Sequence, residues 1–149
     1  MRKIVLFILA NLYLCLMLSA QRTPTSTQTR DLTALIDKYS QAREQRDTAL
    51  LRTIMIPDVD QLVSNGEWRQ GIAASIRGML SSSAASPGTR TLTVDRIRLL
   101  STDVALLDCK YVIQDGNNST RNMWSTFIAV FNKKTWRIAA IRNMLPAAQ

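Results

Sequence analysis

The sequence contains no histidine among its 149 residues. This absence excludes a histidine general base, a Ser-His-Asp or Cys-His nucleophilic arrangement, and every metal site that needs an imidazole ligand. Cysteine is nearly absent too, and Cys15 lies in a predicted leader, so Cys109 alone would remain and no intramolecular disulfide can form. Cys109 falls on the apolar phase of a predicted strand, and we interpret it as a buried, unreactive thiol.

Long hydrophobic runs are also missing, except at the N-terminus. Arg2 and Lys3 precede a largely apolar run at 4–18, which is shorter than the ~18–20 residues that a membrane-spanning helix needs. Ala20 supplies a small residue at the cleavage position. We therefore predict a signal peptide at 1–20, export to a periplasm or to the medium, and no membrane span after cleavage. A retained N-terminal anchor is the alternative.

Basic residues outnumber acidic ones, but they do not cluster. Removing Arg2 and Lys3 leaves 17 basic residues against 11 acidic ones, a net charge of +6. The arginines are spread over separate segments, and nucleic-acid binding normally requires a basic patch or stripe. We therefore predict no nucleic-acid partner.

Apolar periodicity predicts helices in the first half of the domain. The polar segment 21–30 is interpreted as a flexible lead-in. Asp31 is the predicted N-cap of a first helix, whose apolar residues recur at helical spacing: Leu32, Leu35, Ile36, Tyr39 and Ala42. Asp47 is the predicted N-cap of a second helix that ends before Pro57, and a third helix follows from about Ile72.

Strand patterns occupy the remaining segments. Asn65-Gly66 predicts a two-residue hairpin between strands at 59–63 and 67–69. From Thr91 the apolar period becomes two, with a bulge predicted at Asp95-Arg96, and three further strands follow at 104–114, 122–131 and 135–143. This order, without βαβ alternation, predicts an α+β fold with helices on one face of a curved sheet.

Three stretches resemble the nuclear transport factor 2-like superfamily, and in particular its SnoaL-like branch with the SgcJ/EcaC group. They are 57–71, which includes Gly66-Glu67-Trp68; 100–107; and 127–140, which ends in Trp-Arg-Ile-Ala-Ala. The resemblance implies a SnoaL-like domain at 31–146. Its expected fold is cystatin-like, a cone-shaped curved antiparallel sheet packed on three N-terminal helices. It also implies an apolar cavity inside the cone and a homodimer formed through the sheet.

The resemblance and the residue types together suggest candidate site residues. Asp60 is the candidate catalytic carboxylate, because it lies on the segment where the ketosteroid isomerase-like members keep their acid. The candidate ligand-binding residues are Tyr39, Trp68, Tyr111, Phe127, Arg142 and Asn143. No metal site and no cofactor are predicted.

Three functions follow as hypotheses of different classes. The first is an exported cone, non-catalytic or weakly catalytic, that binds a small apolar molecule, because no complete catalytic set is present. The second is a SnoaL-like isomerase, cyclase or lyase that uses Asp60 with Arg142 or Tyr111 as its electrostatic partner. The third is a dimerisation or interaction module that uses an apolar sheet face at Trp124, Thr126, Ile128 and Val130.

Overall fold

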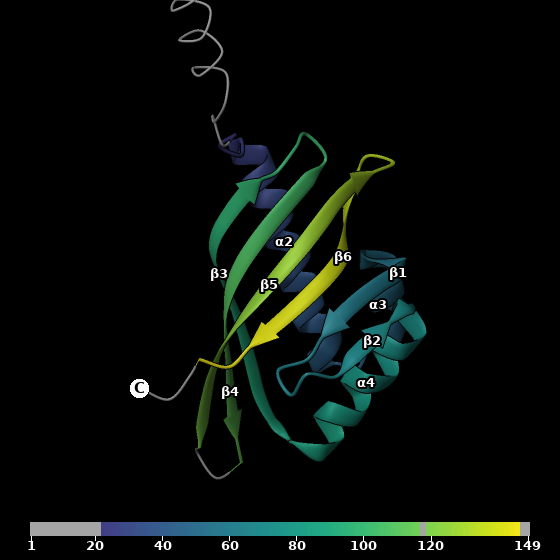
Figure 1. The fold of residues 1–149 in the computed structure, drawn as a ribbon, viewed down its shortest axis with the longest axis vertical. Coiled ribbons are helices and arrows are strands. Elements are labelled where there is room, and N and C mark those ends of the chain that lie inside the picture. The colour runs from purple at the N-terminus through teal and green to yellow at the C-terminus, as the bar shows by residue number, and fades with distance from the viewer. Residues whose placement is uncertain (1–21, 117–118, 147–149) are drawn as a thin grey trace, which may run out of the picture.

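The computed structural model describes residues 22–116 and 119–146 (Figure 1). The helices are α2 (Ser26–Glu44), α3 (Thr48–Ile54) and α4 (Gly71–Ala85). The strands are β1 (Met55–Leu62), β2 (Trp68–Gln70), β3 (Gly88–Leu99), β4 (Val104–Asp115), β5 (Thr120–Asn132) and β6 (Thr135–Met144). The predicted signal peptide at 1–20 lies outside the described residues.

Helix α2 begins five residues before the predicted N-cap. Thr25 is the N-cap, and its hydroxyl accepts a hydrogen bond from the Gln28 backbone while the Gln28 side chain accepts one from the Thr25 backbone. This reciprocal capping box satisfies two backbone donors that the first turn would otherwise leave free. Asp31 therefore lies inside the helix, and the second half of the predicted lead-in, 26–30, is helical. The predicted apolar stripe is confirmed, because all five of its residues are buried.

Helix α3 starts where the sequence indicates, since Asp47 Oδ1 accepts a hydrogen bond from the Leu50 backbone at 2.9 Å. The chain then enters β1 directly at Met55, so the helix ends three residues before Pro57 and the strand begins four residues earlier than predicted. Proline has no backbone N–H to donate, and Pro57 lies in the irregular part of the pairing between β1 and β6.

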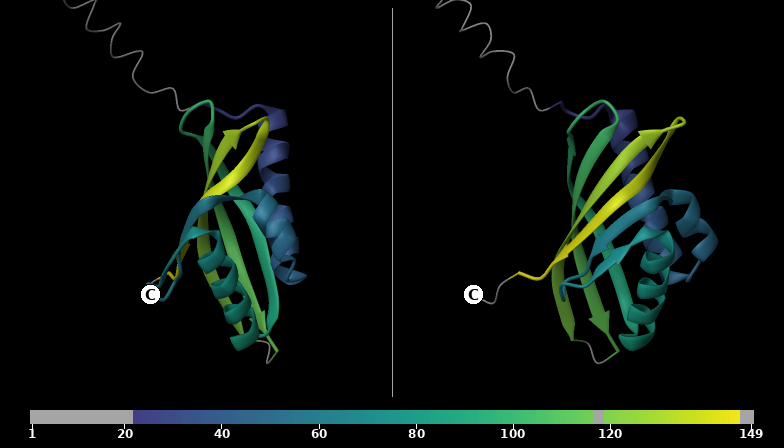
Figure 2. Two further views of the ribbon diagram at one scale, coloured as in Figure 1. Left: turned by 90° about the vertical axis from the view of Figure 1, so that its right-hand side faces the viewer. Right: turned by 45° about the vertical axis from the view of Figure 1, so that its right-hand side comes forward.

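The sheet has the order β2-β1-β6-β5-β4-β3. Neighbouring strands pair antiparallel, with the exception of β1 and β6, which run parallel. The chain forms β2, β3, β4 and β5 before β6 returns to lie beside β1. The sheet curves, and the helices lie on one of its faces (Figures 1 and 2). The predicted α+β fold is confirmed; the prediction of a purely antiparallel sheet is corrected at this one pair.

Local turn chemistry fixes the register of two hairpins. Gly66 adopts a positive φ of 90°, and hydrogen bonds from Gly66 N to Val63 O and from Val63 N to Glu67 O enclose a three-residue loop. The predicted two-residue loop is therefore one residue short, because Gly66 follows the turn instead of lying at its centre. Lys133 and Lys134 form the two-residue turn between β5 and β6. The predicted bulge in β3 is confirmed by the register shift between Val94 and Arg96.

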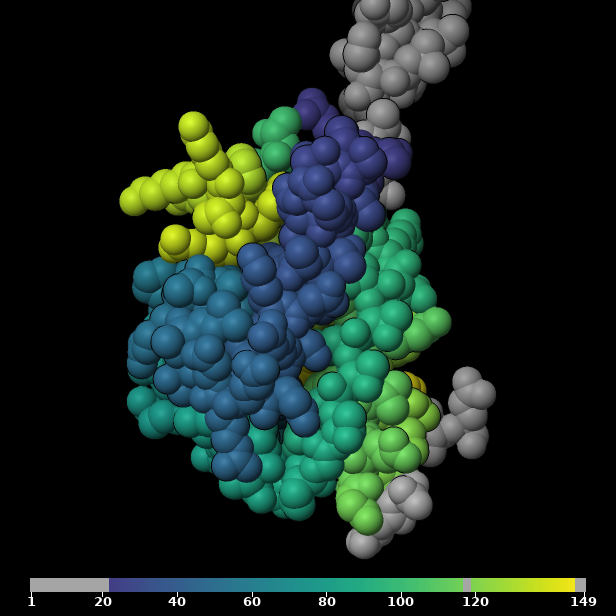
Figure 3. Space-filling model, turned by 180° about the vertical axis from the view of Figure 1, so that it is seen from behind, coloured from purple at the N-terminus to yellow at the C-terminus, as the bar shows by residue number. Residues whose placement is uncertain are grey.

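The core lies between the helices and the inner face of the sheet. Alternate residues of β4, including Ala105, Leu107 and Cys109, are buried there, and so are Phe127 and Ile138 of the next two strands. From behind, α2 is seen to lie beside β3, and α3 lies on the other side of α2 (Figure 3). The inner-face residues nearer the turn between β4 and β5 form a separate apolar cluster of Tyr111, Ile113 and Met123. This second cluster lines the cavity described below.

Candidate functional site

A cavity of about 260 Å³ lies at one end of the sheet, where the C-terminal ends of α2 and α4 meet the inner face of the strands. The β1–β2 hairpin forms a further wall through Val63 and Asn65. Because three helices cannot cover the full length of such long strands, the inner face beyond the main core stays accessible at this end. The site is therefore a consequence of the fold, and it corresponds to the cavity that the family resemblance implies.

One wall of the cavity is apolar. Ile113 of β4 and Met123 of β5 belong to one apolar cluster on the inner face, and Val63 and Ala85 add apolar surface from the hairpin and from α4. Apolar walls with a few convergent polar groups are typical of small-molecule sites. The family resemblance implies an apolar cavity. Only this wall is apolar, because charged side chains line the other walls.

Four arginines line the same cavity: Arg43 from α2, Arg69 from β2, Arg90 from β3 and Arg121 from β5. Glu67 is the only acidic residue among the lining residues. The cavity therefore has a net positive charge, which a low-dielectric surrounding makes more effective than it would be in water.

Among these four arginines, Arg69 has a structural role. Its guanidinium is buried and donates two hydrogen bonds to Glu67, of 2.8 and 3.1 Å, and one of 3.0 Å to Ser82 Oγ. The hydrogen bonds from Arg69 lower the pKa of the Glu67 carboxyl below its ordinary value. Gly78 of α4 leaves the space for this guanidinium, since a Cβ there would lie 2.1 Å from Arg69 Nε. Arg69 thus ties the hairpin to α4, and its charge is neutralised locally.

Arg43 has a different environment. Its Nη1 donates a 2.8 Å hydrogen bond to the Tyr111 hydroxyl, and its guanidinium carbon lies 6.0 Å from the Tyr39 ring centre and 5.9 Å from that of Tyr111. Its Nε is buried without a hydrogen-bond partner. The ion pairs among the described residues include none from Arg43 to a carboxylate. Arg43 is therefore a mostly enclosed cation supported by two aromatic rings and one hydroxyl.

Two amides complete the polar part of the cavity. Asn143 Oδ1 accepts a 2.7 Å hydrogen bond from Ser125 Oγ, which holds the amide in place at the end of β6. Gln61 is buried, and its Oε1 has no hydrogen-bond partner. Gln61 Oε1 is therefore enclosed beside the cavity, whereas the Asn143 amide is held in place at the cavity wall.

The structure brings only two of the predicted ligand-binding residues, Tyr111 and Asn143, to this cavity. Tyr39 and Phe127 belong to the filled main core, where their rings pack edge to face at 5.1 Å. The Tyr39 hydroxyl donates to Met79 Sδ at 3.3 Å, and burial raises the pKa of its phenol. Neither side chain lines the cavity, which corrects that expectation.

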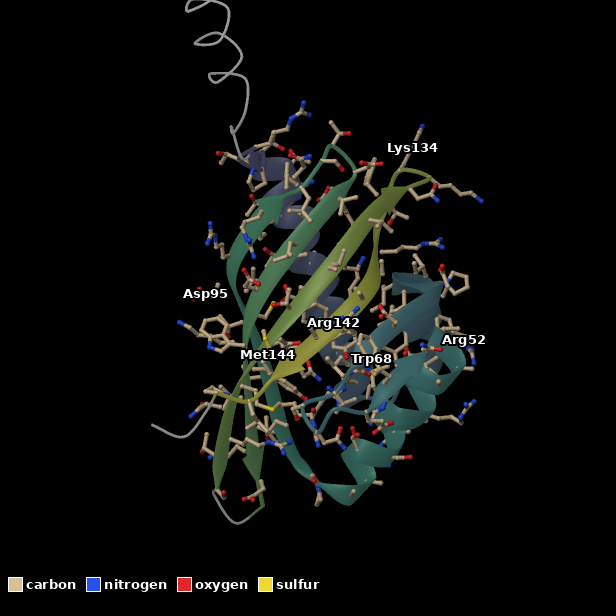
Figure 4. The ribbon with its side chains drawn as sticks, in the orientation of Figure 1. Arg52, Trp68, Asp95, Lys134, Arg142 and Met144 are labelled. Carbon is tan, nitrogen blue, oxygen red and sulfur yellow. The ribbon has the colours of Figure 1, made fainter. Side chains whose placement is uncertain are left out.

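Asp60, Trp68 and Arg142 lie on the opposite face of the sheet. Their inward-facing neighbours Gln61, Arg69 and Ile141 are buried, and side chains alternate between faces along a strand. Arg142 pairs with Asp60 at 2.7 Å, and its guanidinium carbon lies 4.7 Å from the Trp68 ring centre (Figure 4). The structure therefore corrects the expectation that Asp60 and Arg142 act inside the cone, because the register of β1 and β6 turns both outward.

Cys109 is buried on the inner face, as predicted. Burial raises the pKa of its thiol to about 12, and the carboxylates of Asp108 and Asp95 add to the shift. Asp108 accepts hydrogen bonds from Arg98 and Thr126, and Asp95 pairs with Lys110. The thiol is thus protonated at neutral pH and has no basic partner to activate it.

We expect Cys109 to resist alkylation in the native protein. In a Cys15→Ser variant, which leaves Cys109 as the only thiol, iodoacetamide at pH 8 should label the native chain at least a thousandfold more slowly than the chain in guanidinium, because a pKa near 12 reduces the thiolate fraction by about that factor. Mass spectrometry measures the labelling. The exposed Ala84→Cys in a background without other cysteines serves as the reactive control, and equal rates at the two positions would contradict the assignment.

Sequence reasoning missed the arginines because they are far apart in the chain and share no motif. Arg43, Arg90 and Arg121 occur on three different elements, and only the curvature of the sheet brings them to one cavity. A usable signal was present for Arg43, because it follows the buried Ala42 at the end of the apolar stripe of α2. A cation at that position lies close to the inner face of the sheet.

Other surface features are less suited to ligand binding. A trough of about 550 Å³ between α2 and β3 is larger than the cavity, but it is open and lies partly over exposed threonines such as Thr29 and Thr93. Within 22–116 and 119–146, no three Cys, Asp or Glu residues gather closely enough to hold a metal ion. No helix in this part of the chain is both long and apolar enough to cross a membrane.

The curved six-stranded sheet with three helices on one face defines the nuclear transport factor 2-like, cystatin-like fold, and solved structures support this assignment. A domain of unknown function with a cystatin-like fold from Nostoc punctiforme has a TM-score of 0.73 at 13% identity, covering 84% of this chain and 81% of its own. A nuclear transport factor 2-like protein from Novosphingobium aromaticivorans has a TM-score of 0.69 at 17% identity, covering 81% and 83%.

A third similar structure is a putative calcium/calmodulin dependent protein kinase II association domain from Xanthomonas campestris. Its TM-score is 0.67 at 16% identity, and the match covers 89% of this chain and 99% of that one. At such identities the likeness establishes the fold alone. No protein-family model matches the sequence, and no curated protein matches it significantly.

Proposed function

We propose that this protein binds a small molecule in the cavity at the open end of its curved sheet, outside the cytoplasm, and that it does so without catalysis. The cavity carries the proposal, because it combines an apolar wall with the side chains of Arg43 and Arg121, which have no carboxylate partner among the described residues. The export component is supported by the leader pattern of the first 20 residues. The finer assignment to the SnoaL-like branch is supported by the three sequence stretches that resemble it.

A non-catalytic function is supported by what the cavity contains. Its one carboxylate, Glu67, is held by two hydrogen bonds from Arg69 and so is not placed to accept a proton from a ligand. The sequence has no histidine, and the Cys109 thiol is protonated. General acid–base chemistry needs a group that is free to exchange its proton near neutral pH.

A thermal-shift screen tests the proposal. We expect the melting temperature to rise for one class of small amphiphilic compounds, because a ligand that binds only the folded state stabilises it. Ala85→Phe places a ring at the cavity wall and should abolish the shifts, whereas Ala84→Phe adds the same ring beside it at an exposed position that does not line the cavity. Shifts that are absent throughout, or equal in the two variants, would contradict binding in the cavity.

The outer face of the sheet favours self-association as a second property. Trp124, Ile128 and Val130 of β5 are only partly buried, and Met144 of β6 is about half exposed beside them. An apolar face over central strands is a suitable surface for a second copy of the chain. We propose a homodimer on this face, and sedimentation that shows a monomer at high protein concentration would contradict it.

A further inference from the structure

Arg43 carries a positive charge that the described part of the protein does not neutralise. Moving a cation out of water costs free energy unless a counter-ion or hydrogen bonds replace the lost hydration. Here the Tyr111 hydroxyl supplies one hydrogen bond, the rings of Tyr39 and Tyr111 supply weak attraction near 6 Å, and Nε remains without a partner. The partners of the Arg43 guanidinium are therefore a neutral hydroxyl and two rings, and no carboxylate of the described residues balances its charge.

Arg69 shows how this chain treats an arginine that serves structure alone. Its guanidinium is buried as well, but Glu67 and Ser82 accept its hydrogen bonds and Gly78 leaves room for it. The two arginines line the same cavity, and only one of them has a carboxylate partner. The difference indicates that the charge of Arg43 is directed to something that is not part of the fold.

Two further arginines strengthen the positive field around Arg43. The Arg90 guanidinium is anchored by hydrogen bonds to backbone oxygens, including a 3.1 Å bond to Gly88 O, so it is positioned but not neutralised. Arg121 is exposed at the same cavity and has no ion pair among the described residues. Planar guanidinium groups bind carboxylate and phosphate groups in preference to neutral ones.

The same cavity also has an apolar wall of Ile113, Met123 and Val63. A ligand that fills both parts must have an anionic head and a compact apolar body. The cavity volume of about 260 Å³ limits that body to a single ring or a short chain. A long lipid or a polynucleotide does not fit such a volume.

We infer that the ligand of this cavity is a small amphiphilic anion, with a carboxylate or phosphate-monoester head on Arg43, supported by Arg90 and Arg121, and an apolar body against β4 and β5. The inference rests on the proposed binding function and names the ligand class for the same site. Carboxylate and phosphate share the recognition chemistry, and the experiment below separates them.

The experiment compares matched probes on the full chain by isothermal titration. The probes are 4-phenylbutyrate, 3-phenylpropyl phosphate and the neutral 4-phenylbutan-1-ol, which share an apolar body and differ in the head group. We expect one of the two anionic probes to bind at least about tenfold more tightly than the alcohol. A hydrogen bond to a charged group contributes a binding free energy that corresponds to a tenfold or larger change in affinity. We also expect this preference to shrink as salt is raised.

Substitutions test whether Arg43 causes the preference for an anionic head group. Arg43→Met keeps the length of the side chain and should remove most of the preference for the anion while the alcohol binds as before. Arg43→Lys should retain part of it. Arg52→Met, at an exposed arginine of α3 that does not line the cavity, is the control for net charge (Figure 4). Thermal melting without ligand shows whether each variant is folded.

The outcomes separate the two claims. If the alcohol binds as tightly as both anions, and Ala85→Phe blocks it, the binding function stands and the inference about the anion is overturned. If Arg52→Met reduces the preference as much as Arg43→Met, the recognition is general charge attraction and the inference is again overturned. If no probe binds and the wider screen is also negative, the proposed function itself fails.

Discussion

Replacing Phe127 with alanine is expected to lower the free energy of unfolding by about 3–5 kcal/mol, which is a large share of the stability of an ordinary domain. Phe127 has no exposed surface, and its ring packs edge to face on Tyr39 of α2 with centres 5.1 Å apart. This contact joins the middle of the sheet to the longest helix. The truncation leaves a cavity between rigid elements that cannot close around it, so the full transfer and cavity costs are expected.

The matched control is Phe131→Ala in the same strand. Phe131 is 43% exposed and contacts Trp136 beside the turn between β5 and β6, so its loss should cost at most about 1.5 kcal/mol. Denaturant unfolding followed by tryptophan fluorescence measures both values. Similar losses at the two positions would show that Phe127 does not hold the helix on the sheet as described.

Replacing Gly78 with alanine is expected to destabilise the protein by about 2–4 kcal/mol, although alanine is the better helix former by about 1 kcal/mol. The added methyl group would lie 2.1 Å from Arg69 Nε and 2.4 Å from its Cζ, so the guanidinium must leave its position. Arg69 would then lose its hydrogen bonds to Glu67 and Ser82, and the Glu67 carboxylate would lose its cationic partner. Breaking a partly buried, hydrogen-bonded ion pair is the costly step.

A double-mutant cycle isolates this mechanism. In an Arg69→Ala background the clash is absent, and Gly78→Ala should instead stabilise the protein by about 0.5–1 kcal/mol through helix propensity. The sign of the effect therefore reverses between the two backgrounds. A destabilisation of equal size in both would assign the cost of the methyl group to some other neighbour than Arg69.

The sequence predicted the elements that depend on local signals. The apolar stripe of α2, the Asp47 cap of α3 and the bulge at Asp95 each involve neighbours within a few residues, and each is present. The start of α2 was misplaced because Asp31 and Thr25 are both good caps. Thr25 has Gln28 three residues later, which closes the capping box. The motifs that resemble the nuclear transport factor 2-like superfamily gave the overall fold.

The contents of the candidate site were much harder to predict. Whether Asp60 and Arg142 point into the cone depends on the parallel register of β1 with β6, and a shift of one residue exchanges the two faces. The arginines of the cavity come from elements whose distance in space is set by sheet curvature and by the packing of α4. Neither the curvature of the sheet nor the packing of α4 is encoded within a short window of sequence.

The parallel pairing of β1 with β6 also determines when the sheet can be completed during protein synthesis. Asp60 and its partner Arg142 are 82 positions apart, and β6 is the last strand of the chain to be made. Until β6 has left the ribosome, β1 and β5 each lack a neighbour, and their backbone donors and acceptors stay open to other partners. Until then the exposed edges of β1 and β5 are sites at which the nascent chain can pair wrongly or aggregate.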